Sequence, residues 1–211
     1  MTEQLVLFFD FLGTVAFAIS GALIGVNKKM DLFGIIVLAC TTACGGGVIR
    51  DIVVGNIPPN MFRDPTYVGI ATVVAVVVFI LVYVHAKMPQ KLTPLYDKML
   101  FWFDTLGLAA FTVDGVMVGV NCGYGDNLFL LVFLGFLTAV GGGTLRDMLA
   151  GRIPDIFIKH IYAVAAIAGG LAMTLTRGLG DKISMVLGFC LVITLRCLAA
   201  HYRWNLPRIR E

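Results

Sequence analysis

Two matched segments hold the residues of this chain that could do chemistry. They read GGGVIRDIVVGNIP and GGGTLRDMLAGRIP, and in each a run of three glycines precedes an Arg-Asp pair. Inside a helix each glycine costs about 1 kcal/mol relative to alanine, so two equivalent runs predict a helix broken at the glycines. Carbonyls that end a half-helix can coordinate a cation, and amides that open the next one favour an anion. The glycine runs are Gly45, Gly46, Gly47 and Gly141, Gly142, Gly143.

A plainer interpretation of the glycines also stays open. Small residues let two membrane helices cross closely, and the runs need do nothing more than this. Three threonines flank the runs, Thr41, Thr42 and Thr138. Their hydroxyls either serve a path beside the breaks or merely bond backbone carbonyls.

Charged residues follow each glycine run at a depth where an isolated charge in a membrane is costly. Neighbours on a helix do not face one another, so each charge is expected to pair with a residue of another helix. Two interpretations remain, a brace that holds the helices in register and a charge pair that lines a pathway. The charged candidates are Arg50, Asp51, Arg146, Asp147, Asp10 and Asp104. Asp114 is a further pathway candidate because the equivalent residue of the other segment is Ser20.

Composition places these residues in a membrane. Residues of the AVILMFWYC set make up 59% of the 211 residues, charged residues 14%, and the mean hydropathy is +0.91. This excludes a typical soluble enzyme and a disulfide mini-protein. The net charge of +3 gives no footprint for nucleic acid. No nucleotide fingerprint or catalytic triad is present, so neither an enzyme nor a cofactor is expected.

The elements that must position the charges are apolar helices, and about 20 apolar residues are needed to span the hydrocarbon core. The sequence predicts an all-α membrane protein with seven transmembrane helices in a single domain over 1–211. The predicted spans are 5–26, 32–57, 66–86, 101–120, 128–153, 161–176 and 183–201.

The spans contain an internal repeat. Residues 9–26 align with 103–120 with nine of 18 positions identical, and 42–58 align with 138–154 with ten of 17 identical. Repeat one covers 5–86, repeat two covers 101–176, and the helix at 183–201 is appended. Three spans per repeat turn the second copy upside down in the membrane, an arrangement that recurs in transporters.

Basic residues predict the orientation. Ten of the 16 Lys and Arg residues fall in loops on one side, three fall in loops on the other, and three fall inside apolar runs. By the positive-inside rule the N-terminus is outside and the C-terminus is cytoplasmic. Arg196, near the end of its span, is expected to snorkel to the interface.

The doubled GGGxxRDxxxGxIP motif, the two three-span repeats and the seventh helix resemble the prokaryotic trimeric intracellular cation (TRIC) channels. This family overlaps a bacterial group labelled as glycine-transporter-like membrane proteins. The resemblance implies a homotrimer in which each protomer has its own pore, lined by the two kinked helices, and conducts monovalent cations, chiefly potassium. The lysine-containing motif of the animal branch is absent. No bound metal or cofactor is implied beyond the transported potassium or sodium ion and membrane lipid.

Two functions are therefore expected in order. The first is a passive cation channel in the plasma (inner) membrane of a bacterium or archaeon, with the path between the two broken helices. The alternative is a secondary transporter of a small zwitterion such as glycine, which would use the same half-helix ends for a carboxylate and an ammonium group. A non-conducting scaffold would leave the paired breaks without a role.

Overall fold

The computed structural model describes residues 2–85, 93–158 and 161–204, and these ranges hold nine α-helices and no strand. Two of the helices have only four residues. The helices are α1 (Thr2–Asn27), α2 (Leu32–Val53), α3 (Asn60–Arg63), α4 (Thr66–His85), α5 (Thr93–Gly119), α6 (Leu128–Leu149), α7 (Asp155–Ile158), α8 (Tyr162–Leu175) and α9 (Asp181–His201). The all-α prediction is therefore confirmed for the described part of the chain.

Six of the helices are long and apolar enough to cross a membrane, namely α1, α2, α4, α5, α6 and α9. The predicted span 161–176 forms α8, an apolar helix of 14 residues. At 1.5 Å per residue it reaches about 21 Å, short of the ~30 Å hydrocarbon core. The count of seven full spans is therefore not confirmed, and six long helices and one short apolar helix take its place.

The helices α2 and α6 end earlier than predicted. The sequence placed their ends at residues 57 and 153, whereas they end at Val53 and Leu149. Gly55 and Gly151 follow these ends with φ angles of 75° and 63°. Glycine adopts this left-handed conformation at little cost, and it stops a helix at that point.

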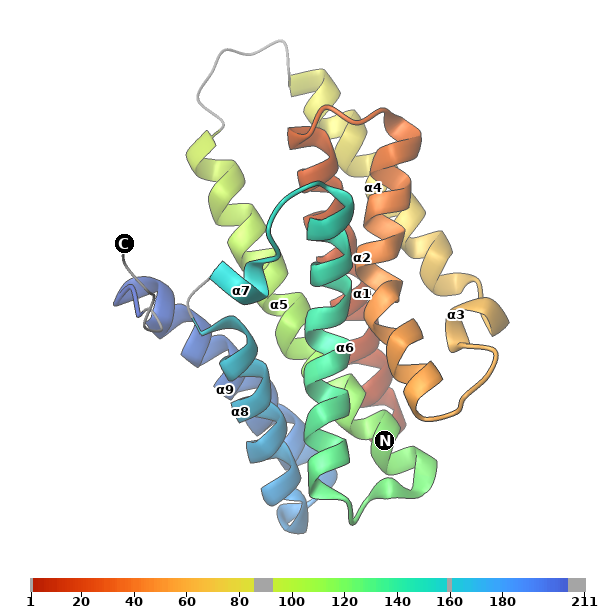
Figure 1. The fold of residues 1–211 in the computed structure, drawn as a ribbon, viewed down its shortest axis with the longest axis vertical. Helices are drawn as coiled ribbons and strands as arrows, with labels where there is room; N and C mark the ends of the chain where they lie inside the picture. The colour runs from red at the N-terminus through yellow and green to blue at the C-terminus, as the bar shows by residue number, and fades with distance from the viewer. Residues whose placement is uncertain (1, 86–92, 159–160, 205–211) are drawn as a thin grey trace.

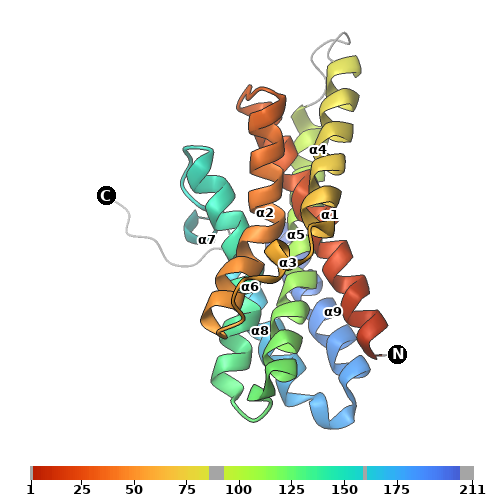
Figure 2. The same cartoon turned by 90° about the vertical axis from the view of Figure 1, so that its right-hand side faces the viewer.

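The two repeats run in opposite directions (Figures 1 and 2). In the view of Figure 1, α1 runs upward and α2 downward, whereas α5 runs downward and α6 upward. The centre of the molecule consists of α1 packed on α5 and α2 packed on α6. On the outside, α4 packs on α1 and α2, while α8 and α9 pack together beside α5 and α6. The short helices α3 and α7 occupy equivalent places after α2 and α6.

The glycine runs do not break their helices. Both α2 and α6 are continuous α-helix through Gly45–Gly47 and Gly141–Gly143, so the predicted break is wrong. The two helices cross there instead. A Cβ on Gly46 would overlap the carbonyl oxygen of Thr138, and a Cβ on Gly142 would overlap that of Thr42. The glycines are required for this close approach of two backbones, and packing outweighs the low helix propensity of glycine.

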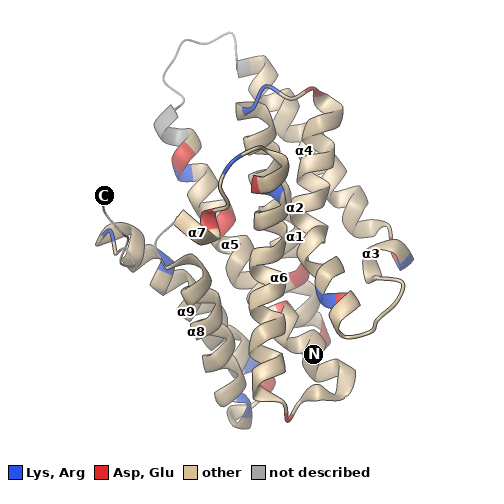
Figure 3. Cartoon of the chain, viewed as in Figure 1, with Lys and Arg blue, Asp and Glu red and all other residues tan. Residues whose placement is uncertain are grey.

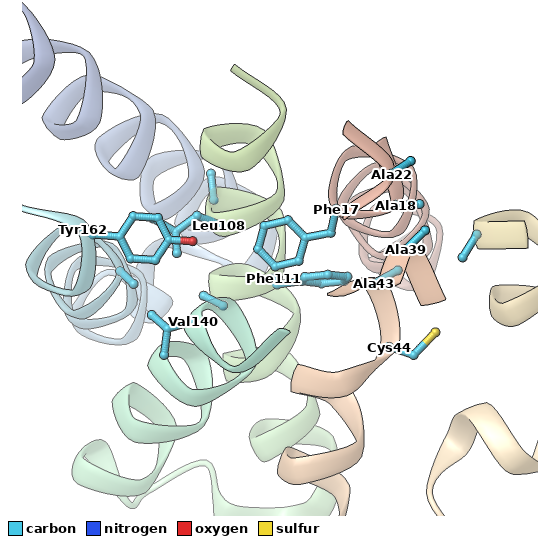
Figure 4. Packing of buried hydrophobic residues seen from close by; sticks show 14 of the residues in the cluster. Phe17, Ala18, Ala22, Ala39, Ala43, Cys44, Leu108, Phe111, Val140 and Tyr162 are labelled. Carbon is cyan, nitrogen blue, oxygen red and sulfur yellow. The ribbon is translucent and has the colours of Figure 1, made fainter. Parts of the chain in front are cut away.

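A second reciprocal contact fills the centre between α1 and α5. Phe17 and Phe111 are equivalent residues of the repeat, and their rings pack edge to face with centroids 5.2 Å apart (Figure 4). Each ring lies over a glycine of the other helix, Phe111 over Gly13 and Phe17 over Gly107. Both phenylalanines are buried. The axis that relates the repeats therefore carries an aromatic plug.

Charged residues occupy the helix ends and two interior sites, near the lower end of α2 and the upper end of α6 (Figure 3). Five of the ten basic residues assigned to the cytoplasmic side lie outside the described residues, namely Lys87, Lys91, Lys159, Arg208 and Arg210. The predicted orientation in the membrane stays a prediction.

Candidate functional site

The first interior site is built around Arg50, which lies near the end of α2 and is 6% exposed. Its Nε and Nη2 atoms donate to Oδ1 of Asp51 at 3.0 and 2.9 Å, and its Nη1 atom donates to Oδ2 of Asp114 on α5. The other oxygen of Asp51 accepts from the backbone N–H of Asn60, the first residue of α3, at 2.8 Å. The Arg50 site thus joins α2, α3 and α5.

Two expectations about this pairing need correction. Arg50 bonds its neighbour Asp51, because its long side chain folds back so that the guanidinium reaches the adjacent carboxylate. Its partner on another helix is Asp114, and no ion pair with Asp10 is formed. Asp10 instead forms a side-chain hydrogen bond with Tyr67 of α4. The residue that differs between the repeats, Asp114, is therefore the one that anchors Arg50.

A cavity of about 270 Å³ opens beside Arg50. Its lining runs from exposed residues after α3, Arg63 and Asp64, to buried residues in the centre, Phe111 and Thr138. The side chains of Asp10, Arg50, Asp51, Tyr67 and Asp114 lie between these ends and also line the cavity. A polar path thus enters the helix bundle and stops at the aromatic plug. We call this space the Arg50 cavity.

The charges of the Arg50 cavity do not balance. Asp10, Asp51 and Asp114 surround a single guanidinium. Arg63 and Asp64 at the mouth compensate each other in formal charge. With all groups ionised, the interior carries two surplus negative charges. The exposed carboxyl of Asp64 has a pKa below its usual value of 3.8 because it accepts hydrogen bonds from the side chain and backbone of Thr66.

The second interior site surrounds Arg146, which is fully buried near the end of α6. Its Nε atom donates to Asp147 at 3.0 Å, and its Nη1 atom donates to Asp104 of α5 at 2.8 Å and to the Ser20 hydroxyl of α1. Its Nη2 atom lies 3.6 Å from Asp155. The expected pairing across helices with Asp104 is therefore present, together with the unexpected bond to the adjacent Asp147.

Two further arginines complete this second site. Arg152 donates to Asp155 at 3.1 Å and lies 3.6 Å from Asp147. Arg196 of α9 lies 3.7 Å from Asp104, and its guanidinium stacks over the rings of Phe101 and Tyr162, 5.1 and 4.8 Å from the ring centroids. Three arginines thus face three aspartates, and the charges of the Arg146 site balance.

The snorkelling expected for Arg196 is wrong. Its side chain is 3% exposed, and it turns into the bundle because Asp104 and two aromatic faces compensate the buried charge. Sequence reasoning also missed Asn60 and Asp155, whose backbone N–H groups bond Asp51 and Asp147. These two bonds show that Asn60, rather than Pro59, is the equivalent of Asp155, one residue away from the sequence alignment.

The threonines beside the glycine runs have the plainer of their two expected roles. The hydroxyls of Thr42 and Thr138 donate to the carbonyls of Leu38 and Leu134, four residues earlier in the same helix. Thr41 is half-buried and is not part of the cavity lining. Across the described ranges, no group of three or more His, Cys, Asp or Glu side chains has the geometry to hold a metal ion.

A family model described as "Glycine transporter" matches residues 7–83 and 101–177, which correspond to the two repeats. Among relatives, the UPF0126 membrane protein of Deinococcus radiodurans is 40% identical over 79% of this chain and 74% of its own. The UPF0126 inner membrane protein YadS of Escherichia coli K12 is 36% identical over 96% of this chain and 94% of its own.

Solved structures give the same fold. The TRIC orthologue of Rhodobacter sphaeroides superposes with a TM-score of 0.84 and 31% identity, covering 95% of this chain and 99% of that one. A prokaryotic TRIC channel in 0.5 M KCl superposes with a TM-score of 0.86 and 30% identity, covering 97% and 100%.

Proposed function

Since the chain belongs to the family described as "Glycine transporter" and has the fold of prokaryotic TRIC channels, we propose that it is a passive channel for monovalent cations, chiefly potassium. The solved structures it resembles are channels and not enzymes. The observation that carries the proposal is the Arg50 cavity, a polar entrance with surplus carboxylates that ends at the centre of this fold.

The surplus charge gives the cavity a preference for cations. Two negative charges about 8 Å from an ion stabilise it by roughly 1 kcal/mol even at the dielectric constant of water. That corresponds to a local cation enrichment of about fivefold, and an equal depletion of anions. Arg50 holds two of the carboxylates in place, so it acts as the brace of the entrance.

The gate lies at the inner end of the cavity. Phe111 belongs to the cavity lining and packs on Phe17, and both rings are buried. A hydrophobic constriction excludes water and thereby ions until it widens. The crossing of α2 and α6 at Gly46 and Gly142 has no side chains to interlock, so sliding of these helices is the motion that opens the path. This mechanism replaces coordination by free carbonyls, because both helices are continuous through the glycine runs.

The description of the family favours a second candidate, a transporter of a small zwitterion such as glycine. That mechanism needs free half-helix ends for the carboxylate and ammonium groups. The continuous helices α2 and α6 offer none at the glycine runs, which supports the channel over the transporter.

The remaining features of the proposal follow from the resemblance and the charge pattern. The functional unit is a homotrimer with a separate pore in each protomer, surrounded by lipid in the inner membrane. Seven segments cross the membrane if α8 is counted with the six long helices. The N-terminus lies outside and the C-terminus inside, and the Arg50 cavity opens on the outer side.

Reversal potential in a planar bilayer under a potassium chloride gradient tests the proposal. We expect discrete currents that reverse near the potassium potential. Phe111→Ala should enlarge them, and Phe8→Ala, at an exposed phenylalanine of α1, serves as the control. No current together with saturable glycine uptake in liposomes would reject the channel in favour of the transporter.

A further inference from the structure

The residues that line the Arg50 cavity have counterparts in repeat two that form no such entrance. The equivalent pairs are Asp10 and Asp104, Arg50 and Arg146, Asp51 and Asp147, Asn60 and Asp155, and Tyr67 and Tyr162. In repeat one Asp10 and Tyr67 are half-buried, whereas Asp104 and Tyr162 are 1% and 3% exposed. The backbone scaffold of an entrance is thus present twice, and only one copy is open.

The helix α9 supplies what differs in repeat two. It has no counterpart in repeat one, and it packs on α5 and α8, where Asp104 and Tyr162 are located. Arg196 extends from α9 between these residues, 3.7 Å from Asp104 and over the Tyr162 ring. A guanidinium therefore fills the position that corresponds to open space between Asp10 and Tyr67.

The hydrogen bonding of the two tyrosines differs in the same way. Tyr67 bonds Asp10, but the buried hydroxyl of Tyr162 has no hydrogen-bond partner among the described residues. Asp104 is instead engaged by Arg146 and Arg196. Asp104 thus has two alternative partners within reach, the arginine of α9 and the tyrosine of α8.

We propose that Arg196 closes a second cation entrance in repeat two, and that its release from Asp104 opens this entrance on the other face of the membrane. In the open state Asp104 bonds Tyr162, as Asp10 bonds Tyr67. Three aspartates then face the two arginines Arg146 and Arg152, and the site gains one surplus negative charge. The role of the entrance in conduction rests on the proposed function, whereas its opening to water does not.

Thiol labelling tests the opening without any current. Cys44 lines the Arg50 cavity, and the equivalent residue of repeat two is Val140, which is 4% exposed and belongs to the same apolar cluster as Tyr162 (Figure 4). The protein would carry a single cysteine, at position 44 or at position 140, with the other natural cysteines replaced by alanine. Each form would be reconstituted as the assembled protein and exposed to a water-soluble methanethiosulfonate reagent.

We expect Cys44 to react and Val140→Cys to resist the reagent. Adding Arg196→Leu should speed labelling at position 140 by about tenfold, because a buried thiol is otherwise reached only by local opening. Arg196→Lys keeps the charge beside Asp104 and should preserve most of the protection. Labelling at position 140 that is fast with Arg196 present, or unchanged by Arg196→Leu, would overturn the proposal.

A second variant separates opening from unfolding. Arg196→Leu with Asp104→Asn restores the charge balance and should retain the thermal midpoint of the parent protein while position 140 stays reactive. If both variants unfold, Arg196 is a structural brace and the proposal is wrong. In bilayers Arg196→Leu should raise the current about twofold. Absence of current in every form, with labelling as expected, would reject the channel but keep the Arg196 entrance.

Discussion

The Arg50 site of repeat one and the Arg146 site of repeat two grow from the same GGGxxRD motif, yet they differ in charge balance and burial. One arginine meets three carboxylates beside an open cavity in repeat one. Three arginines meet three carboxylates in a closed interior in repeat two. The shared motif fixes the backbone and the Arg-Asp bond, while the residues around it decide whether ions or protein charges neutralise the carboxylates.

Few substitutions produce this difference. Asn56 bonds the side chain of Asn60 at 3.1 Å, and at the equivalent positions Arg152 bonds Asp155 at the same distance. A neutral amide pair in one repeat is thus an ion pair in the other. Ser20 in place of Asp114 and the added Arg196 complete the change. Duplication supplied two similar frames, and a handful of charges made one an entrance and the other a brace.

The helix crossing common to both repeats should show the largest effect. Gly46→Ala and Gly142→Ala each drive a Cβ into a backbone carbonyl, and we expect each to lower the free energy of unfolding by about 3 kcal/mol. Thermal unfolding of the detergent-purified protein measures this. Gly47→Ala is the control, because its Cβ meets only Arg50 Nη2 at 3.5 Å. Unequal losses for Gly46 and Gly142 would break the symmetry described here.

The two arginines of the motif should differ in their effect on stability. Arg146→Gln leaves buried aspartates uncompensated, and we expect a loss of about 3–5 kcal/mol in the free energy of unfolding. Arg50→Gln should cost less than half as much, because water in the cavity can solvate Asp51 and Asp114. Denaturant unfolding of both variants gives the comparison. Equal losses would mean that the Arg50 cavity is dry.

The unmatched aspartate should control conduction. Asp114→Asn removes one of the two surplus charges of the Arg50 cavity, so we expect cation current to fall about twofold at moderate salt. Asp126→Asn, at an exposed residue of the loop after α5, is the control because salt screens its charge. Current ratios in bilayers decide the matter. A larger fall for Asp126→Asn would place the entrance elsewhere.

The smallest effect concerns the start of the outer helix in each repeat. Asp64 accepts from the backbone N–H of Thr66 at 2.9 Å, whereas α8 begins after Ile161 with no side-chain cap. The folded pKa of Asp64 is lowered, so its stabilising contribution is present above the unfolded pKa and is lost as pH falls through the lower folded value. Thermal midpoints at neutral pH and at about pH 3 should therefore differ slightly less for Asp64→Asn than for the parent protein. An identical pH dependence would show that the bond is absent in solution.

Much of this architecture is predictable from sequence. The repeat, its inversion and the positions of the long helices follow from apolar runs and from identities such as Phe17 with Phe111. The pairing of Arg146 with Asp104 also follows, because buried charges need partners. These features depend on patterns along one helix or on simple compensation of charge.

What could not be predicted depends on three-dimensional contacts. Helix propensity indicated a break at the glycines, but only the approach of Gly46 to Thr138 of the other repeat shows why the glycines are there. The direction of Arg196 depends on Phe101 and Tyr162, which come from two different helices. Asp114 was singled out by its mismatch with Ser20, yet its partner Arg50 lies 64 residues away in sequence.

Each arginine of the motif takes one partner from the other repeat, Arg50 from Asp114 and Arg146 from Ser20. This exchange has a consequence for biogenesis. A nascent chain that has inserted only α1 to α4 holds Arg50 in the bilayer before its partner on α5 has been synthesised. Repeat two, by contrast, already contains Asp104 when α6 enters the membrane. The first half must therefore wait, partly assembled, for the second, and the translocon or a membrane chaperone is the natural shelter for Arg50 during that interval.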